Sequence, residues 1–273
     1  MAFGYELAKR IPSLRERDRS LYTLGCLGPD VYFFDRLPPT PFHPNQKKHG
    51  NLLHKAPCDA LARAFSEAAK EALLPYVYGF LTHIALDSTL HPYICALHTG
   101  HDHTRFEGDI DAIFYARFQD RVPFAALLRR PDNLDALDAL ITAVSKRVVS
   151  AGERGAYARS CRKLLRLFPL LFDPNGGRFR FVSGVERLFH KEGALSAFLL
   201  AAPRRYFDDC MNEAHRPWYA LPFPSTERTE SVDELFSEAE TLAAGMLDAA
   251  LKGDYDAVCR LCAQRTMEAG PLP

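Results

Sequence analysis

The sequence predicts an all-α protein. Apolar residues recur at the three- and four-residue spacing of a helix in eight segments, whereas the alternating pattern of a half-buried strand is scarce. Proline, glycine and capping residues separate these segments, as expected at helix ends. The eight predicted helices cover residues 7–11, 60–74, 76–90, 110–118, 134–149, 157–172, 185–200 and 232–251.

Local signals mark several boundaries of these helices. Pro75 lies directly before the third helix, and Pro131-Asp132 opens the region of the fifth. Residues 173–177, Asp-Pro-Asn-Gly-Gly, form a turn sequence that ends the sixth. Ser231 and Glu234 have the spacing of a capping box, in which each side chain bonds the other's backbone amide, and they predict the start of the last helix.

Length and charge limit the class of protein. A chain of 273 residues with 47% hydrophobic and 25% charged residues can bury a substantial core. We expect one domain over residues 1–273, in which the second half, about 124–273, is a helical extension that walls the site. Because Lys plus Arg equals Asp plus Glu at 34 each, no net field attracts nucleic acid or an anionic membrane, although a local basic patch is compatible with this balance. No stable nucleic-acid partner is predicted.

Cysteine usage and the amino terminus favour the cytoplasm. Seven cysteines without regular spacing fit reduced thiols better than a disulfide framework, and Cys259 and Cys262, the only Cys-x-x-Cys pair, are interpreted as apolar positions of the last helix. The first residues reach a charge by Glu6 without the apolar core of a secretory signal, and no later segment is apolar enough to span a bilayer. As written, the sequence predicts a cytoplasmic protein with no transmembrane segment.

Two motifs predict a metal site. His83, Asp87 and His91 are spaced four residues apart, and His103 and Glu107 repeat that spacing. Residues four apart lie on one face of a helix, so each pair can hold one ion. Imidazole nitrogen combined with carboxylate oxygen is the donor mixture of hydrolytic zinc, whereas structural zinc favours thiolates.

The distribution of histidine strengthens this prediction. A single histidine on an apolar helix is more often a satisfied core residue than a ligand. A group of imidazoles and carboxylates that project inward together, however, needs a cation to offset the burial of charge. Eight of the ten histidines precede residue 104: His43, His49, His54, His83, His91, His98, His101 and His103.

The order of these motifs resembles the bacterial zinc-dependent phospholipase C family, whose superfamily includes fungal single-strand nucleases. The resemblance extends over about residues 3–111, and Asn212 to Trp218 also resembles a late segment of family members. The segments that carry the resemblance are Gly28-Pro29-Asp30 with the following Val31 to Phe34, Gly50 to His54, Gly79 to His83 with Asp87 and His91-Pro92-Tyr93, and His103 to Asp111.

The resemblance implies a mostly helical fold around two or three zinc ions that cleaves phosphodiester bonds, with phospholipid as one candidate substrate. In the implied assignment, Asp30 is the catalytic carboxylate that positions or deprotonates the attacking water. His49 competes with His54 for one ligand position, and the Gly-x-x-x-His match favours His54. The implied metal ligands are His54, His83 and Asp87 for the first zinc, and His91, His103 and Glu107 for the second.

The start of the chain departs from the family pattern. Family members carry a histidine three residues before the Phe-Gly that corresponds to Phe3-Gly4, and that position precedes Met1. Either the start codon lies upstream of this sequence, or the third metal site is incomplete.

Two other functions compete with a phospholipase C-like hydrolase. An HD-type phosphohydrolase, also all-α, is suggested by His83, the adjacent pair His101-Asp102 and Asp109, although Gly100 and its polar neighbours predict a loop at that pair. A helical binding protein that keeps the fold without turnover is suggested by the absent early histidine. The sequence leaves the oligomeric state open.

Aromatic residues near the motifs are candidates for a substrate pocket, since they can bury a lipid, a base or a cationic head group. Core packing is the competing interpretation for each of them. They are Tyr32, Phe33, Phe34, Phe42 and Trp218.

Overall fold

The computed structural model describes residues 1–12, 14, 18–36, 47–200, 202, 205–220, 227–268, 270 and 271. Within these ranges about two thirds of the residues are helical and sheet is almost absent, which confirms the predicted all-α class. The α-helices are α1 Ala2–Ala8, α2 Arg19–Leu27, α3 Lys47–His54, α4 Cys58–Ala68, α5 Leu74–Leu97, α6 His101–Phe118, α7 Phe124–Leu127, α8 Leu134–Val149, α9 Ala156–Leu171, α10 Gly177–Leu188, α11 Val232–Leu251 and α12 Tyr255–Leu261.

Short elements complete the described fold. Two antiparallel pairs join β1 (Trp218–Tyr219) to β2 (Glu227–Arg228) and β3 (Arg265–Thr266) to β4 (Gly270–Pro271). The 3₁₀ helices are η2 Gly28–Arg36, η3 Glu71–Leu73 and η4 Ser196–Phe198. Each helix in the described part of the chain is too short or too polar to cross a bilayer.

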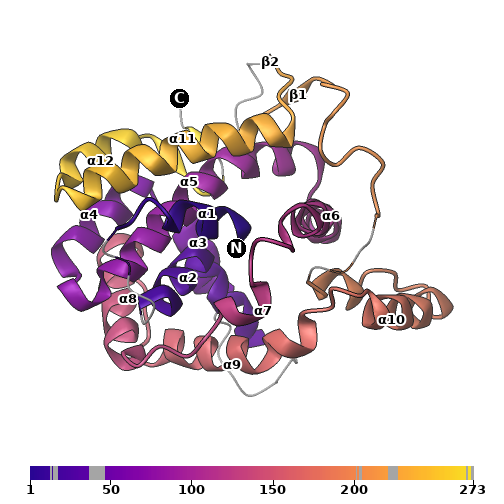
Figure 1. Cartoon of the computed structure of the whole chain (residues 1–273), viewed down its shortest axis with the longest axis horizontal. Coiled ribbons are helices and arrows are strands. Elements are labelled where there is room, and N and C mark those ends of the chain that lie inside the picture. The colour runs from indigo at the N-terminus through magenta and orange to yellow at the C-terminus, as the bar shows by residue number, and fades with distance from the viewer. Residues whose placement is uncertain are drawn as a thin grey trace.

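Helix α5 is the central element of the molecule and packs mainly against α2 and α11 (Figure 1). Its residues are buried on nearly all sides, as expected for a helix that is apolar all round. Gly25 of α2 and Gly79 of α5 allow the two backbones to touch: a Cβ on Gly79 would lie 2.1 Å from the carbonyl oxygen of Tyr22. This close approach fixes α5, which carries three of the predicted metal ligands.

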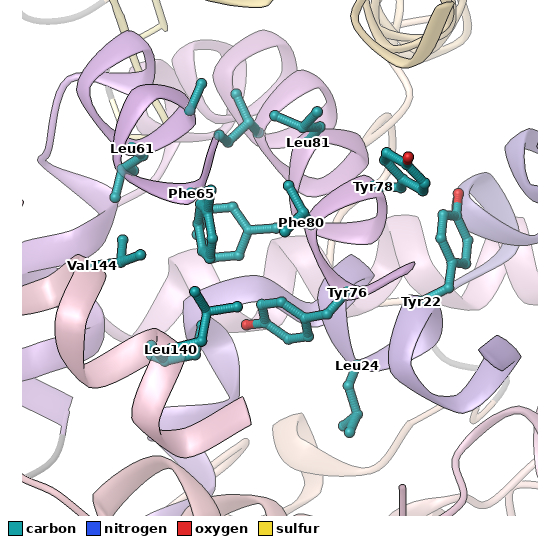
Figure 2. Close-up of a cluster of buried hydrophobic side chains, with 14 of the residues drawn as sticks. Tyr22, Leu24, Leu61, Phe65, Tyr76, Tyr78, Phe80, Leu81, Leu140 and Val144 are labelled. Carbon is teal, nitrogen blue, oxygen red and sulfur yellow. The ribbon is translucent and has the colours of Figure 1, made fainter. Parts of the chain in front are cut away.

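Aromatic packing holds the main core together. Phe65 of α4 and Phe80 of α5 have ring centroids 4.7 Å apart, and Figure 2 shows Leu140 and Val144 of α8 facing the same cluster. The buried hydroxyls of Tyr76 and Tyr157 lie 2.8 Å apart and hydrogen-bond across α5 and α9. Helices on both sides of residue 124 therefore share one hydrophobic core.

The capping box predicted at the last long helix is confirmed. The Ser231 hydroxyl accepts a hydrogen bond from the Glu234 amide at 3.3 Å, and the Glu234 carboxylate accepts one from the Ser231 amide at 2.8 Å. Reciprocal bonds of this kind satisfy amides that a helix start leaves unpaired.

Several predicted boundaries were wrong. The helix expected at 7–11 is α1, which ends at Ala8, and the helix expected at 60–74 is α4, which ends at Ala68. Two further differences are larger. The helix expected at 185–200 is α10, which ends at Leu188, because the buried Glu186 carboxylate captures the amides of Gly193, Leu195 and Ser196 and folds the chain back. The loop expected at His101-Asp102 is the first turn of α6, which begins directly after Gly100.

Gly79→Ala is expected to destabilise the fold by about 3 kcal/mol, because the added methyl group collides with backbone rather than with a movable side chain. Gly184→Ala on α10 is the matched control, since a Cβ there meets no atom within 4 Å. Loss of a helical glycine is expected to stabilise that variant by about 0.5–1 kcal/mol. Urea unfolding followed by circular dichroism measures both, and equal stability of the two variants would contradict the α2–α5 contact.

Candidate metal centre

Three elements bring the first donor group together. Asp30 lies on η2, His54 is the last residue of α3, and His83 lies on α5 with Asp87 one turn later. The His54 Nε2 atom lies 3.0 Å from Asp30 Oδ1 and 3.5 Å from Asp87 Oδ2, and His83 Nε2 lies 3.3 Å from the same Asp87 oxygen. Donor atoms of Asp30, His54 and His83 all fall within 4.8 Å of one another.

The orientation of His54 is fixed by two contacts. Its Nδ1 atom lies 2.8 Å from the Gly50 carbonyl oxygen, one helical turn earlier, so Nδ1 carries the donated proton and Nε2 faces the carboxylates. The Phe33 ring stacks on the imidazole at 5.5 Å with an interplanar angle of 11°. A ligand imidazole held by a backbone carbonyl in this way is common at metal sites.

Gly28 makes room for His83. Its φ of +49° lies in the left-handed region, and a Cβ on it would lie 2.3 Å from Cδ2 of the His83 ring. The Tyr157 hydroxyl donates to the Gly28 carbonyl oxygen at 3.3 Å, which ties this backbone to α9. No residue other than glycine fits here while His83 keeps its position.

Helices α5 and α6 bring the second donor group together. Glu107 Oε1 lies 3.2 Å from His91 Nε2 and 3.1 Å from His103 Nε2, and the three donor atoms lie within 4.8 Å of one another. The His91 ring stacks on His54 with centroids 6.2 Å apart and an interplanar angle of 15°. The two donor groups therefore adjoin in one site.

Attraction between imidazoles and carboxylates stabilises the charged forms in both donor groups. Burial opposes protonation of His91, yet Asp87 and Glu107 raise its pKa to about 9. Burial likewise opposes the charged form of His103, and Cys95 and Glu107 raise its pKa to about 10. Burial disfavours ionised Glu107, but His103 and His91 lower its pKa to about 2.

Neighbouring opposite charges also shift the pKa values of Asp87 and His54. Burial disfavours ionised Asp87, but the imidazoles of His83, His91 and His54 hold its pKa well below its usual range. Burial opposes protonation of His54, but the adjacent carboxylates of Asp30 and Asp87 raise its pKa well above its usual value. The carboxylates and imidazoles therefore compensate each other's charge, and a divalent cation can replace the protons that the imidazoles carry.

The residues present fit zinc. Both groups consist of imidazole and carboxylate donors without a thiolate, as at hydrolytic rather than structural zinc sites. Although their atoms converge, the buried His83 Nε2 and Asp87 Oδ2 make no hydrogen bond. Buried polar atoms seldom lack hydrogen-bond partners. Two such atoms 3.3 Å apart therefore indicate that both bind the same metal ion.

A family model described as zinc dependent phospholipase C matches residues 1–154. The chain belongs to this family. The match covers both donor groups and more than half of the 273 residues. No curated protein and no solved structure matches the chain. Membership in the zinc-dependent phospholipase C family agrees with the resemblance carried by the sequence motifs, and it indicates a zinc-dependent hydrolase.

The structure thus brings together all seven residues singled out from the sequence. Asp30 and Glu107 are the most open of them, with side chains 39% and 37% exposed, while His83 at 4% lies deepest. Their individual roles stay predictions. His49 lies outside both donor groups, with its ring 5.9 Å from that of Tyr32.

Other candidates lie elsewhere. Trp218 packs on Tyr93 at 5.4 Å, and both line a cavity of about 220 Å³ that none of the seven candidate site residues lines. Asp102, needed by the HD-type alternative, forms an exposed ion pair with Arg105 and joins neither donor group. Phe42 lies outside the described residues.

Sequence reasoning missed the residues that support the ligands. Gly28 and Gly50 belong to the quoted motifs, but the sequence did not show their roles. Gly28 makes room for His83 on another element, and the Gly50 carbonyl oxygen accepts a hydrogen bond from the His54 ring. The Gly-Pro dipeptide at Gly28 is the one local signal of special backbone geometry there.

Zinc uptake is expected to release protons. In the metal-free protein, pKa values of about 9 and 10 keep His91 and His103 protonated at about pH 7, whereas zinc binds neutral imidazole. Apparent zinc affinity therefore rises with pH up to these values. Titration calorimetry in two buffers of different ionisation enthalpy measures the release, and His103→Ala should release fewer protons. The same binding enthalpy in both buffers would contradict the prediction.

Gly28→Ala is expected to weaken zinc binding about 10–100-fold, because the new methyl group displaces the His83 ring. Gly253→Ala is the matched control: it also places an alanine at positive φ (+76°), but its Cβ meets no atom within 4 Å. Competition with a chromogenic chelator measures both affinities. If Gly28→Ala binds zinc as tightly as the control, the contact with His83 has no importance for the site.

Proposed function

We propose that this protein is a zinc-dependent phosphodiester hydrolase of the phospholipase C type, in which an activated water attacks phosphorus. Two adjoining donor groups of hydrolytic character carry the proposal, and family membership supports it. His54, His83 and Asp87 would hold one zinc ion, and His91, His103 and Glu107 would hold another, in a full complement of two or three ions. Zinc bound there would lower the pKa of water from about 16 to about 7 and offset charge that develops on the phosphate oxygens.

Asp30 acts on the attacking water. Its carboxylate is the most exposed member of the first group, and it lies 3.0 Å from His54 Nε2. From this position it can accept a proton from water or orient the water toward a phosphodiester at the open side of the site. His83 and Asp87, with side chains 4% and 16% exposed, would hold the metal and do not meet the substrate.

The substrate class follows from charge and exposure. A phosphodiester carries one negative charge, which two adjoining cation sites attract, and Phe33 offers an apolar surface beside His54. A phospholipid is therefore one candidate substrate.

Asp30→Asn is expected to keep its zinc and to lower kcat on a chromogenic phosphodiester by about 10²–10⁴-fold, because the amide cannot take a proton. Asp87→Asn is expected to lose zinc as well as activity, and Asp248→Asn on the exposed side of α11 should change neither. Metal analysis and steady-state kinetics on the same samples separate these effects. Zinc loss in Asp30→Asn would make Asp30 a ligand, and wild-type protein that binds zinc without turnover would favour a non-catalytic protein.

A further inference from the structure

Helix α10 displays apolar side chains on its outward face. Phe181 and Leu188 are 74% and 76% exposed, and Val185 between them is 42% exposed. At spacings of four and seven residues they share one face of the helix. Of the ten large hydrophobic residues that are exposed in the described part of the chain, seven lie between residues 170 and 198: Leu170, Phe181, Val185, Leu188, Phe189, Leu195 and Phe198.

The opposite face of α10 is anchored. Ser183 and Glu186 are buried, and the Glu186 carboxylate accepts hydrogen bonds from the amides of Gly193 and Ser196 and from the Ser196 hydroxyl. Arg178 donates to the carbonyl oxygens of three residues at the end of α9: Pro169, Leu170 and Phe172. The apolar residues are therefore presented by a fixed helix, and an ordinary surface helix would carry polar residues there.

Cations accompany the apolar face. Residues 177–192 contain four cations, Arg178, Arg180, Arg187 and Lys191, against two acids, the buried Glu186 and the exposed Glu192. Arg180 and Arg187 are exposed and lie seven residues apart along one flank of the apolar face. In a chain of zero net charge, this is a local excess of positive charge.

We propose that α10 docks the protein on an anionic lipid surface, with Phe181 and Leu188 entering the boundary between head groups and acyl chains. Helices that lie in a membrane interface have this pattern of an outward apolar face flanked by arginine. Figure 1 shows α10 at the outer edge of the molecule, where a flat surface can reach it. A second copy fits less well, because a symmetric contact through this face would bring two sets of arginines together.

Vesicle sedimentation of the full-length protein tests this proposal, and it needs no turnover. Wild-type protein is expected to bind vesicles with about 30% phosphatidylserine, and to bind less at about 0.5 M NaCl or on phosphatidylcholine alone. Phe181→Ala with Leu188→Ala, and separately Arg180→Glu with Arg187→Glu, should each lower binding at least about tenfold.

Helix α12, at the far end of the molecule from α10, supplies matched controls (Figure 1). Leu261→Ala removes another exposed leucine and Arg260→Glu reverses another exposed cation, and both should bind within about twofold of wild type. A blue shift of tryptophan fluorescence in Phe181→Trp on vesicle addition is the second readout, since native Trp218 is buried.

Absence of wild-type binding to the anionic vesicles, or equal loss in the α12 controls, would overturn the proposal. Self-association that the α10 variants abolish, without vesicle binding, would also overturn it and assign the face to contact between copies. Because binding is read without substrate cleavage, failure here leaves the proposed hydrolase untouched, and an inactive protein can still bind vesicles.

Discussion

The burial of carboxylates and imidazoles around α5 is the constraint on which the rest of the structure depends. Asp87 is held ionised among His54, His83 and His91, and the site is stable only because each charge has an opposite neighbour or a cation. These charges can pair only if α5, the helix that carries His83, Asp87 and His91, lies in one position. The glycine contact with α2 fixes the α5 backbone, and Gly28 fixes the space for the deepest imidazole.

Much of this site could be predicted because its spacing is local. His83, Asp87 and His91 follow helical periodicity on one helix, and His103 with Glu107 repeats it on the next, so the sequence alone identified both pairs. That Asp30 and His54 lie beside these pairs was predicted only from the resemblance to the family. Periodicity says nothing about which elements meet, and Asp30 lies on a 3₁₀ helix without any such pattern.

The errors have long-range causes. Apolar spacing predicted one helix over 185–200, but the buried Glu186 carboxylate competes successfully for backbone amides downstream and folds the chain back. For Trp218 the competing interpretation, core packing, agrees with the structure: it packs on Tyr93, which lies two residues after His91 and thus on another face of α5. Such competition is decided by tertiary contacts, which sequence patterns do not record.

The central claim is that six of these residues, His54, His83, Asp87, His91, His103 and Glu107, bind zinc beside Asp30. Metal analysis of protein purified without chelator tests it most directly. We expect at least about one equivalent of zinc in wild-type protein, a large loss in His83→Ala, and no change in His190→Ala, which alters an exposed histidine after α10. Less than about one equivalent in the wild type, or full zinc content in His83→Ala, would contradict the account.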